Sequence, residues 1–364
     1  MKEVKISLNP ALFGCAEKTI AEYGEFCAST FTYSTGVAAL RLKNAAGYFI
    51  LLPFQGQQVW RAFFLGRELT MKTTFPEPLP NRDFISTYGG FLLHCGANSM
   101  GSPGADNKYP QHGELPNIAY DDAYIIFGSD DNGDYAAVGG EVEVRTGFSL
   151  YYKFRPEIKL YAGTSVLDVT CSLVNMRRSP MEYMYLSHIN FLPIDGANLV
   201  YSAKLNAANF KIFIDVPETL PEDRRNKLRT YMEAVDKDPA LHHIVGGPGQ
   251  VYEPEIVFDI KYLADGDGYA HCMQDFGDGA DYAAFKVNEL PHGIRWISRT
   301  GDEDAMGMIL PATADHKGRA EAERRGMLKT LAPGARVEFK YKAGCLDKAG
   351  AARMKAHIES MTAI

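Results

Sequence analysis

The sequence predicts an all-β protein, a large antiparallel β-sandwich with a few peripheral helices. From Tyr124 onward, runs of β-branched and aromatic residues follow one another with only short turns between them. Strands do not alternate regularly with helices, as they do in Rossmann folds and in α/β barrels. The composition is 46% hydrophobic and includes 20 Tyr and 20 Phe, which is enough apolar material for a large core.

The chain is 364 residues long. All-β folds often exceed 200 residues as one unit, so we expect a single sandwich domain over residues 1–364. Residues 1–53 are expected to form a helical and strand lead-in to this domain. A helical insertion is expected near residues 217–250.

The elements are predicted in order from periodicity and from their flanking residues. Asn9 and Pro10 are a suitable cap and first residue for a short helix. A longer helix is predicted from Pro221 to Val235, because its first turn is acidic. Arg319–Arg325 and the tail from Asp347 are also expected to be helical. The remaining periodic runs are predicted strands, and they include Phe26–Tyr33, Val37–Leu42, Tyr48–Pro53, Phe210–Val216, Val251–Leu263, Tyr269–Phe276, Ala283–Val287, Ile294–Arg299, Met306–Leu310 and Arg336–Ala343.

Charge and hydropathy exclude several classes of partner. There are 38 Lys and Arg against 45 Asp and Glu, a net charge of -7, and no basic cluster is long enough to follow a phosphate backbone. We therefore expect no nucleic-acid partner. No stretch approaches the roughly 20 apolar residues of a membrane span, and the amino terminus lacks a signal-peptide core. A cytoplasmic protein with no membrane partner is expected.

Cysteine usage agrees with this expectation. Most of the six cysteines lie within apolar or alternating runs, and none forms a CxxC pair. This pattern favours buried free thiols in a reducing compartment over disulfides or a zinc site. The six are Cys15, Cys27, Cys95, Cys171, Cys272 and Cys345.

The stretch from Tyr88 to Tyr120 is the first candidate for a functional site. It begins as an apolar run that contains His94 and Cys95, continues into a loop rich in Gly, Ser, Asn and Pro, and ends on the sequence HGELPN. A scaffold that delivers titratable groups onto such a loop is a common way to build a site. His112 precedes Gly113 in this loop, and its alternative interpretation is an ordinary surface histidine. For His94, a histidine satisfied within the core is as good an interpretation as a functional one.

His188 lies in a second apolar strand, with the sequence YLSHINF. Side chains alternate along a strand, so Leu186, His188 and Asn190 share one face, and Tyr185 and Ser187 share the other. The polar pair of His188 and Asn190 is therefore either a satisfied core network or the floor of a pocket.

Three further segments carry groups that could bind a ligand. Arg82 offers a guanidinium to hydroxyls or a carboxylate, although a surface salt bridge is nearly as good an interpretation. Glu253, Glu255 and Asp259 lie on or near a strand, and alternation requires at least one of them to face solvent. Trp296, one of two tryptophans, could stack on a sugar face, with core packing as the alternative.

Other patterns do not support a site. Gly246–Gly249 lacks the Lys and Ser or Thr of a phosphate-binding loop. Two adjacent histidines, His242 and His243, would point apart on a regular element. The Asp-rich segment from Asp265 to Asp281 lacks the spacing of a calcium-binding loop. No metal and no cofactor are therefore expected.

Together these residues resemble the aldose 1-epimerase, or galactose mutarotase-like, superfamily, and in particular an uncharacterised branch of it. The resemblance covers residues 55–341, and it rests on the order and spacing of several motifs. These are FLLHCG, the glycine-rich loop before HGELPN, MYLSHINF, VYEPE, the segment ILPAT after Trp296, and LAPGARVEFKY. The resemblance implies a large antiparallel supersandwich with a sugar site. It also implies an arginine, two histidines and a C-terminal glutamate that open and reclose the sugar ring by acid and base catalysis.

Position by position, the resemblance assigns His112 to the loop histidine and His188 to the strand histidine that donates a proton to the ring oxygen. Arg82 is a looser match to the sugar-binding arginine, and His94 matches only this branch. Related branches carry an acid immediately before Pro-Ala-Thr, whereas Leu310 stands there in this chain. A leucine cannot accept a proton. The base must then come from elsewhere, with Glu253, Asp315 and His94 as the options, or the reaction is not performed.

The sequence therefore leaves three hypotheses open. One is an aldose 1-epimerase-like isomerase; another is a sugar-binding protein that kept the pocket and lost the chemistry; the third is a different reaction on the same scaffold. The expected partner is a small-molecule sugar, and the chain is a candidate homodimer. The candidate catalytic residues are His112 and His188, and the candidate substrate-binding residues are Arg82, His94, Asn117, Asn190, Glu253 and Trp296.

Overall fold

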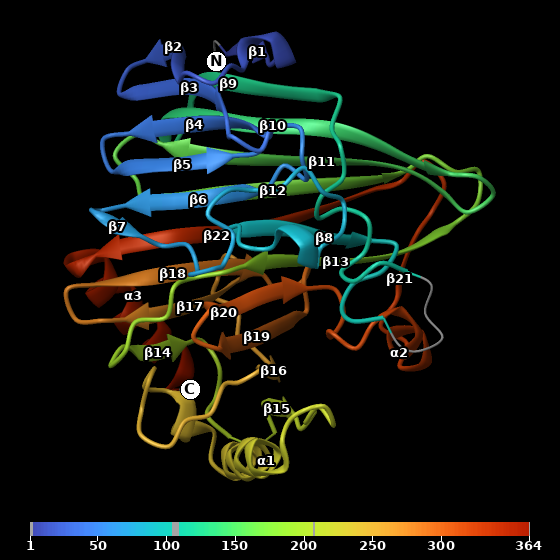
Figure 1. Ribbon diagram of the computed structural model, residues 1–364. Coiled ribbons are helices and arrows are strands. Elements are labelled where there is room, and N and C mark those ends of the chain that lie inside the picture. The colour runs from blue at the N-terminus through green and yellow to red at the C-terminus, as the bar shows by residue number, and fades with distance from the viewer. Residues whose placement is uncertain (1–2, 104–108, 207, 364) are drawn as a thin grey trace.

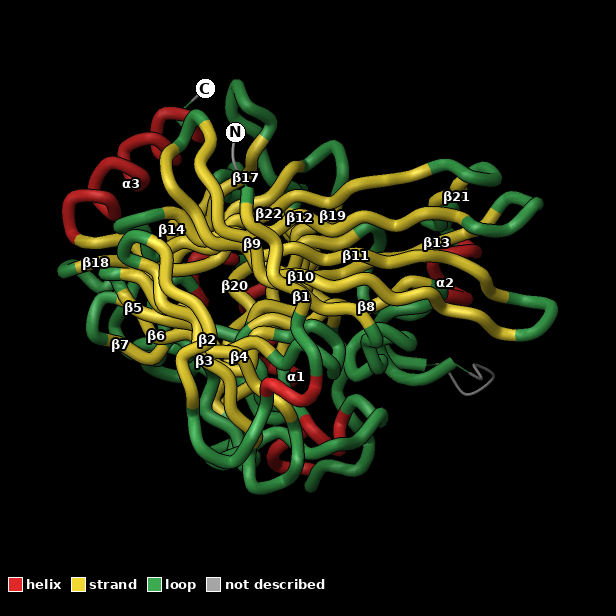
Figure 2. The backbone as a smooth tube through the Cα atoms, turned by 90° about the horizontal axis from the view of Figure 1, so that it is seen from above, coloured by secondary structure: helices red, strands yellow, loops and turns green. Residues whose placement is uncertain are grey.

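Two large antiparallel sheets make up most of the structure, as predicted from the sequence (Figure 1). The computed structural model describes residues 3–103, 109–206 and 208–363. Seen from above, the strands form adjoining layers, with helix α3 at one edge (Figure 2). Part of the predicted glycine-rich loop, residues 104–108, lies outside the described residues.

One sheet contains nine strands, and its order mixes the beginning, middle and end of the chain. Adjacent strands pair antiparallel throughout. In order across the sheet, the strands are β1 (Val4–Ser7), β9 (Asp122–Asp130), β10 (Gly133–Thr146), β11 (Leu150–Tyr161), β12 (Val166–Asn175), β22 (Arg336–Asp347), β18 (Gly279–Lys286), β17 (Tyr269–Asp275) and β14 (Asn198–Tyr201).

The other sheet contains thirteen strands. In order, these are β15 (Phe210–Phe213), β16 (Ile256–Ile260), β19 (His292–Arg299), β20 (Asp304–Ala312), β13 (Met181–Ile189), β8 (Leu92–Ala97), β6 (Val59–Phe64), β5 (Gly47–Leu51), β4 (Ala38–Asn44), β3 (Phe26–Thr32) and β2 (Lys18–Tyr23), with β21 (Lys329–Leu331) beside β13 and β7 (Arg67–Glu68) beside β6. Strand β13 lies between β8 and β20. This pairing joins three segments that are far apart in the sequence.

The helices lie at the periphery of the sheets (Figure 1). The helix predicted from Pro221 to Val235 is α1 (Glu222–Lys237). The other predicted helices are α2 (Arg319–Arg324) and α3 (Lys348–Thr362). Short 3-10 helices are η1 (Pro10–Leu12), η2 (Ile85–Thr87) and η3 (Pro239–His242).

The predicted strands differ from the structure in several places. Strands β1 and β2 were not predicted, because their short sequences expose most of their side chains and show little apolar alternation. The strand predicted over Val251–Leu263 is reduced to β16, Ile256–Ile260. Pro254 has no N–H group, so it cannot donate to a strand ladder and the pairing begins after it.

A buried polar network crosses between the two sheets. His94 on β8 and Tyr185 on β13 meet Cys171 on β12 and Tyr341 on β22, which belong to the opposite sheet. The His94 Nδ1 lies 2.8 Å from the Tyr185 hydroxyl, which lies 3.0 Å from the Tyr341 hydroxyl. All four residues are buried. The substrate-binding role suggested for His94 does not fit this position, because the ring is buried between the sheets, where its Nδ1 is hydrogen-bonded and its Nε2 has no partner among the described residues.

All six cysteines are free, and four of them are buried. Cys15 is exposed and Cys27 is partly exposed, so the prediction of buried thiols holds for the other four. In the part of the chain that the structure describes, no helix has both the length and the apolar composition needed to cross a bilayer.

Burial of His94 predicts an acid-sensitive fold. Burial lowers the pKa of His94 from its usual 6.5 to about 3. Below pH 6.5, His94 binds a proton in the unfolded chain but stays neutral in the folded chain until the pH approaches 3. The free energy of unfolding therefore decreases as the pH falls through this range. The slope expected from this one group is about 1.4 kcal/mol per pH unit. We expect urea unfolding to show the decline between pH 6.5 and 5.

The matched variants are His94→Gln and Tyr341→Phe. The first removes one titrating ring and should lower the slope of the unfolding free energy against pH by about 1.4 kcal/mol per pH unit, while the other buried histidines keep their share. The second removes a hydroxyl from the same network and should leave that dependence unchanged, because His94 remains. Equal slopes in wild type and His94→Gln would contradict the assignment.

Candidate functional site

A pocket lies on the face of the thirteen-stranded sheet opposite to the Tyr185 side. Leu186 and His188 of β13 face it, whereas Tyr185 packs against Phe339 of the other sheet with ring centroids 4.5 Å apart. The pocket and its open mouth hold about 430 Å³ of empty space. Its lining residues come from β13, β16, β19, β20 and the loops around them, and they are Gly101, Ser102, Gln111, His112, Leu186, His188, Glu255, Val257, Ile294, Trp296, Leu310 and His316.

The structure brings His112 and His188 together at this pocket. Their ring centroids are 5.3 Å apart and the rings are nearly perpendicular, at 82°. Phe84 packs 4.6 Å from the His112 ring, and Trp296 packs 5.2 Å from the His188 ring. The two histidines selected from the sequence therefore occupy one aromatic-walled hollow, although their contributing segments are far apart in the chain.

The backbone holds His112 in an unusual conformation. Its φ is 59°, in the left-handed region that non-glycine residues seldom adopt. The conformation is fixed from both sides, because the His112 N–H donates to the Gly101 carbonyl and the His112 carbonyl accepts from the Gly96 N–H, both at 2.9 Å. Backbone strain that is fixed in this way is concentrated at functional sites. The ring is partly buried, so His112 is not an ordinary surface histidine.

Asn190 fixes the tautomer of His188. The Asn190 amide donates to the Gly90 carbonyl at 2.9 Å, so its Oδ1 must face His188, 2.7 Å from Nδ1. The Tyr88 hydroxyl also donates to that Oδ1, at 3.2 Å. An oxygen can only accept, so the His188 Nδ1 carries the hydrogen. In the neutral ring, Nε2 then presents a lone pair. This arrangement confirms the prediction that His188 and Asn190 share a face.

Burial keeps the histidines of the pocket neutral. It lowers the pKa of His188 from 6.5 to about 4, against the opposing effect of the hydrogen bond to Asn190. The pKa of His316 is lowered to about 4, again chiefly by burial. For His112, burial and the neighbouring His188 and His316 hold the pKa well below its usual value. At neutral pH these rings are hydrogen-bonding groups without charge.

Glu255 supplies a carboxylate to the pocket. It is exposed and lies just before β16, and its Oε2 accepts a hydrogen bond of 2.6 Å from the Trp296 Nε1. Trp296 is partly buried and contacts both Glu255 and the His188 ring, so it lies in the pocket wall and not in the core. Among the described lining residues, Glu255 is the one acid. The sequence marked Glu255 only as one of several acids near a strand.

The three alternatives for the missing base lie elsewhere in the structure. Glu253 pairs with Arg224 at 2.8 Å, and 43% of its side chain is exposed. Asp315 is buried in an ion pair with Arg325. His94 lies in the core on the other side of the sheet. Simple alternation could not separate Glu253 from Glu255, because both have the same parity along the segment.

Two other predicted ligand-binding residues, Arg82 and Asn117, are not among the described residues that line the pocket. Arg82 is exposed and is absent from the described residues that line the pocket. Asn117 is buried, where its Oδ1 accepts from the Gln58 amide at 2.9 Å and its Nδ2 donates to the Asp83 carbonyl at 3.3 Å. Asn117 therefore ties the loop that carries His112 to the sheet. Direct contact with a ligand is not needed to account for it.

Leu310 lines the pocket and is 2% exposed. It lies on β20 opposite Ile294 of β19, so this part of the wall is apolar. His316 follows β20 and also lines the pocket, with its ring 4.5 Å from Phe213. The sequence did not single out His316, because nothing in its local pattern separates it from a surface loop.

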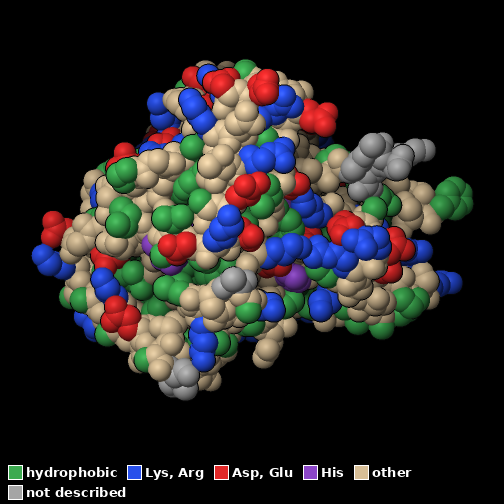
Figure 3. Space-filling view, turned by 90° about the horizontal axis from the view of Figure 1, so that it is seen from below, with side chains coloured by type: hydrophobic (Ala, Val, Ile, Leu, Met, Phe, Trp, Pro, Cys, Tyr) green, Lys and Arg blue, Asp and Glu red, His purple; other side chains and the backbone are tan. Residues whose placement is uncertain are grey.

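Charged side chains lie around the pocket, but no Lys or Arg is among the described residues that line it. Lys and Arg side chains gather on the face seen in Figure 3, interspersed with Asp and Glu. Near the pocket, Lys317 pairs with Asp215 and Arg319 pairs with Glu182. The described lining residues contain neither Lys nor Arg. Glu255 and the uncharged rings therefore favour a ligand that carries no negative charge.

The chain is similar to one known family and to several solved structures. A family model described as "Domain of unknown function (DUF4432)" matches residues 34–344. A protein of Klebsiella pneumoniae subsp. pneumoniae described as a "putative aldose 1-epimerase" is 18% identical with a TM-score of 0.81, over 99% of this chain and 96% of that one. A galactose mutarotase-like protein of Clostridium acetobutylicum is 15% identical with a TM-score of 0.55, over 89% and 99%. A comparison with curated proteins finds no match. These likenesses show a galactose mutarotase-like fold.

The conformation of the His112 loop predicts that replacing Gly113 strongly lowers the stability of the fold. Gly113 has a φ of 81°, and a Cβ there would lie 2.3 Å from the Ser99 carbonyl oxygen and 2.4 Å from that of Gly96. Gly249 has a φ of 80° with open space around it. We expect Gly249→Ala to cost about 1 kcal/mol of unfolding free energy, since only the backbone is strained. Gly113→Ala should cost at least about 2 kcal/mol more, because the backbone must also shift. Urea unfolding of both variants measures the difference, and equal costs would contradict it.

Proposed function

The chain belongs to the family described as "Domain of unknown function (DUF4432)", and we propose that it is an aldose 1-epimerase-like isomerase that interconverts the anomers of an uncharged aldose. One observation carries the proposal. The neutral His188 presents its Nε2 lone pair in the same pocket as the Glu255 carboxylate. The galactose mutarotase-like fold supports the assignment without establishing it, because one fold hosts many functions.

The pocket suits a sugar in its chemistry. Trp296 offers an aromatic surface, and the apolar C–H face of a pyranose packs against such a surface. Uncharged imidazoles of His112 and His316 provide acceptors and donors for hydroxyl groups. The absence of Lys and Arg from the described lining disfavours phosphorylated and acidic sugars.

The reaction needs one proton to move between two oxygens on the same carbon. In the proposed course, His188 Nε2 accepts the proton of the anomeric hydroxyl, and the resulting imidazolium gives a proton to the ring oxygen as the bond from C1 to that oxygen breaks. The product is an open-chain aldehyde and neutral His188. Rotation about the bond between C1 and C2, followed by the reverse steps, gives the other anomer. Protons and electron pairs balance without any further reactant.

This course changes the order of the steps that the resemblance implied for His188. A histidine with a pKa of about 4 is almost wholly neutral at pH 7, so it must accept a proton before it can donate one. Asn190 supports the acceptance, since its Oδ1 binds the Nδ1 hydrogen and stabilises the imidazolium. The Glu255 carboxylate lines the same pocket and stabilises the same charge, and Trp296 orients that carboxylate.

A sugar-binding protein without catalysis is the second candidate. Leu310 supports it, because an apolar side chain lines the wall where the resemblance implies an acid. On this alternative the pocket would bind a sugar and leave the rate of anomer exchange unchanged. We also propose a cytoplasmic location, which the six free thiols support.

The proposal predicts faster exchange of anomers. Proton NMR of the anomeric signals of several unphosphorylated aldoses, with and without protein, follows the approach to equilibrium. We expect acceleration by the wild type, a loss of at least about 100-fold for His188→Gln, and a loss of about tenfold for Glu255→Gln. Glu253→Gln should keep the wild-type rate, because Glu253 pairs with Arg224 outside the pocket. A larger loss for Glu255→Gln than for His188→Gln would reverse their roles.

Leu310→Glu separates catalysis from binding alone. If the wild type binds an aldose by NMR titration without accelerating exchange, and Leu310→Glu gains exchange activity, the second candidate is correct. On our proposal the wild type is already active. Leu310→Glu should then lower stability without raising the rate above about twice that of wild type, because it buries a carboxylate in an apolar wall. Leu310→Met, which keeps an apolar chain of similar size, is the control.

A further inference from the structure

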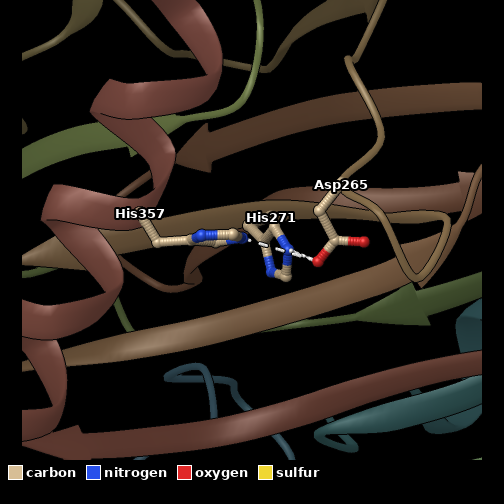
Figure 4. Close-up of side chains that lie close together, drawn as sticks. All are labelled: Asp265, His271 and His357. Carbon is tan, nitrogen blue, oxygen red and sulfur yellow. Dashed lines mark hydrogen bonds and ion pairs between the residues drawn. The ribbon is translucent and has the colours of Figure 1, made fainter.

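A second cluster of chemically active side chains lies outside the pocket. It consists of Asp265 in the loop before β17, His271 on β17 and His357 on α3 (Figure 4). We propose that these three residues bind a divalent transition-metal ion of the zinc class, which fixes α3 to the nine-stranded sheet. The inference is independent of the proposed sugar chemistry, since the cluster shares no residue with the pocket.

The spacing of the three ligand atoms fits one ion. Asp265 Oδ2 lies 2.9 Å from His271 Nε2 and 3.5 Å from His357 Nε2, and all three atoms lie within 4.8 Å of one another. Nitrogen and oxygen ligands about 2.0 to 2.1 Å from a tetrahedral zinc ion are roughly 3.3 Å apart. The observed separations lie on either side of this value, so small side-chain rotations would complete the geometry.

Surrounding hydrogen bonds hold two of the ligands in place. Asp265 Oδ1 accepts from the backbone N–H groups of Asp267 and Tyr269, each at 2.9 Å, which leaves Oδ2 toward the histidines. The buried Tyr282 hydroxyl lies 2.9 Å from His271 Nδ1. A hydroxyl can accept as well as donate, so it can bind the Nδ1 hydrogen when Nε2 turns its lone pair to a metal. Such outer partners orient metal-binding histidines in proteins.

The exposure of the cluster and the types of its ligand atoms limit which ions it could bind. His357 is 43% exposed at its side chain, whereas Asp265 and His271 are 13% and 6% exposed, so the cluster opens to solvent on one side only. That side admits the ion and leaves a coordination position for water. Two imidazoles and one carboxylate suit Zn²⁺, Ni²⁺ and Co²⁺ better than Ca²⁺ or Mg²⁺, which prefer oxygen ligands.

The consequence for the fold follows from the position of α3. Ile358 and Ala351 of α3 pack against Met273 of β17 and Ala280 of β18 in a small apolar cluster. Lys355 also pairs with Asp275 at 3.2 Å. An ion between His357 and His271 would add a rigid link to these contacts. Metal binding would therefore stabilise the attachment of α3.

The test uses the full-length protein freed of metal by a chelator. We expect isothermal titration with Zn²⁺ to give one site per chain, Co²⁺ to give a visible absorption band of tetrahedral coordination, and Zn²⁺ to raise the melting temperature by several degrees. Asp265→Asn and His357→Gln should each weaken Zn²⁺ binding by at least about tenfold. The control is His292→Gln, which disrupts another His–Asp pair, His292 with Asp259 at 3.0 Å, and should leave Zn²⁺ binding unchanged.

Either of two results would overturn the proposal. One is the failure of Zn²⁺, Ni²⁺ and Co²⁺ to bind or to raise the melting temperature, which would make the cluster a hydrogen-bonded clamp only. The other is binding of equal strength in His357→Gln, Asp265→Asn and the wild type. Tyr282→Phe keeps all three ligands and should fold normally, so a moderate loss of affinity in that variant tests the site even if a ligand variant is unstable. Sugar exchange by the metal-free protein is expected to be unchanged, which separates the two proposals.

Discussion

The pairing of β13 between β8 and β20 is the constraint on which both the core and the pocket depend. Leu186 lies opposite Cys95 on one side and Ala312 on the other. Because side chains alternate, this register sends Tyr185 into the polar network between the sheets and His188 into the pocket. A shift by one residue would exchange the two faces, placing His188 in the core and leaving Tyr185 without its partners. The register of β13 thus determines both which side chains fill the core and which side chains line the pocket.

Hydrogen-bond partners distinguish the two buried histidines of this sheet. His94 and His188 occupy opposite faces of the same sheet, and burial lowers the pKa of each. His94 is bound by hydroxyl groups that complete a core network, whereas His188 is oriented by Asn190 through Nδ1, which makes Nε2 the acceptor. The two histidines therefore differ in the direction of their neighbouring hydrogen bonds. Burial alone is similar for both.

The strand pattern could be predicted from the sequence, and so could the position of His188 and Asn190 on the same face of one strand. Both follow from local periodicity. The sequence could not place His94, whose role depends on Cys171 and Tyr341 from the other sheet. It also could not select Glu255 over Glu253, because their difference arises before the start of β16, where Arg224 binds Glu253. The cluster of Asp265, His271 and His357 joins segments from different elements, so no local spacing marks it.

The place of the carboxylate has a physical consequence for the proposed reaction. Glu255 precedes β16, whereas Leu310 lies on β20, with β19 between these two strands. Both residues nevertheless line one pocket. A carboxylate at the buried position of Leu310 would be desolvated, which raises the pKa of a carboxyl group and suits it to accept a proton. Glu255 is exposed, and its carboxylate accepts a hydrogen bond from the Trp296 Nε1. Because Leu310 cannot accept a proton, the proposed reaction assigns the proton-accepting role to the buried, neutral His188 and leaves Glu255 to stabilise charge.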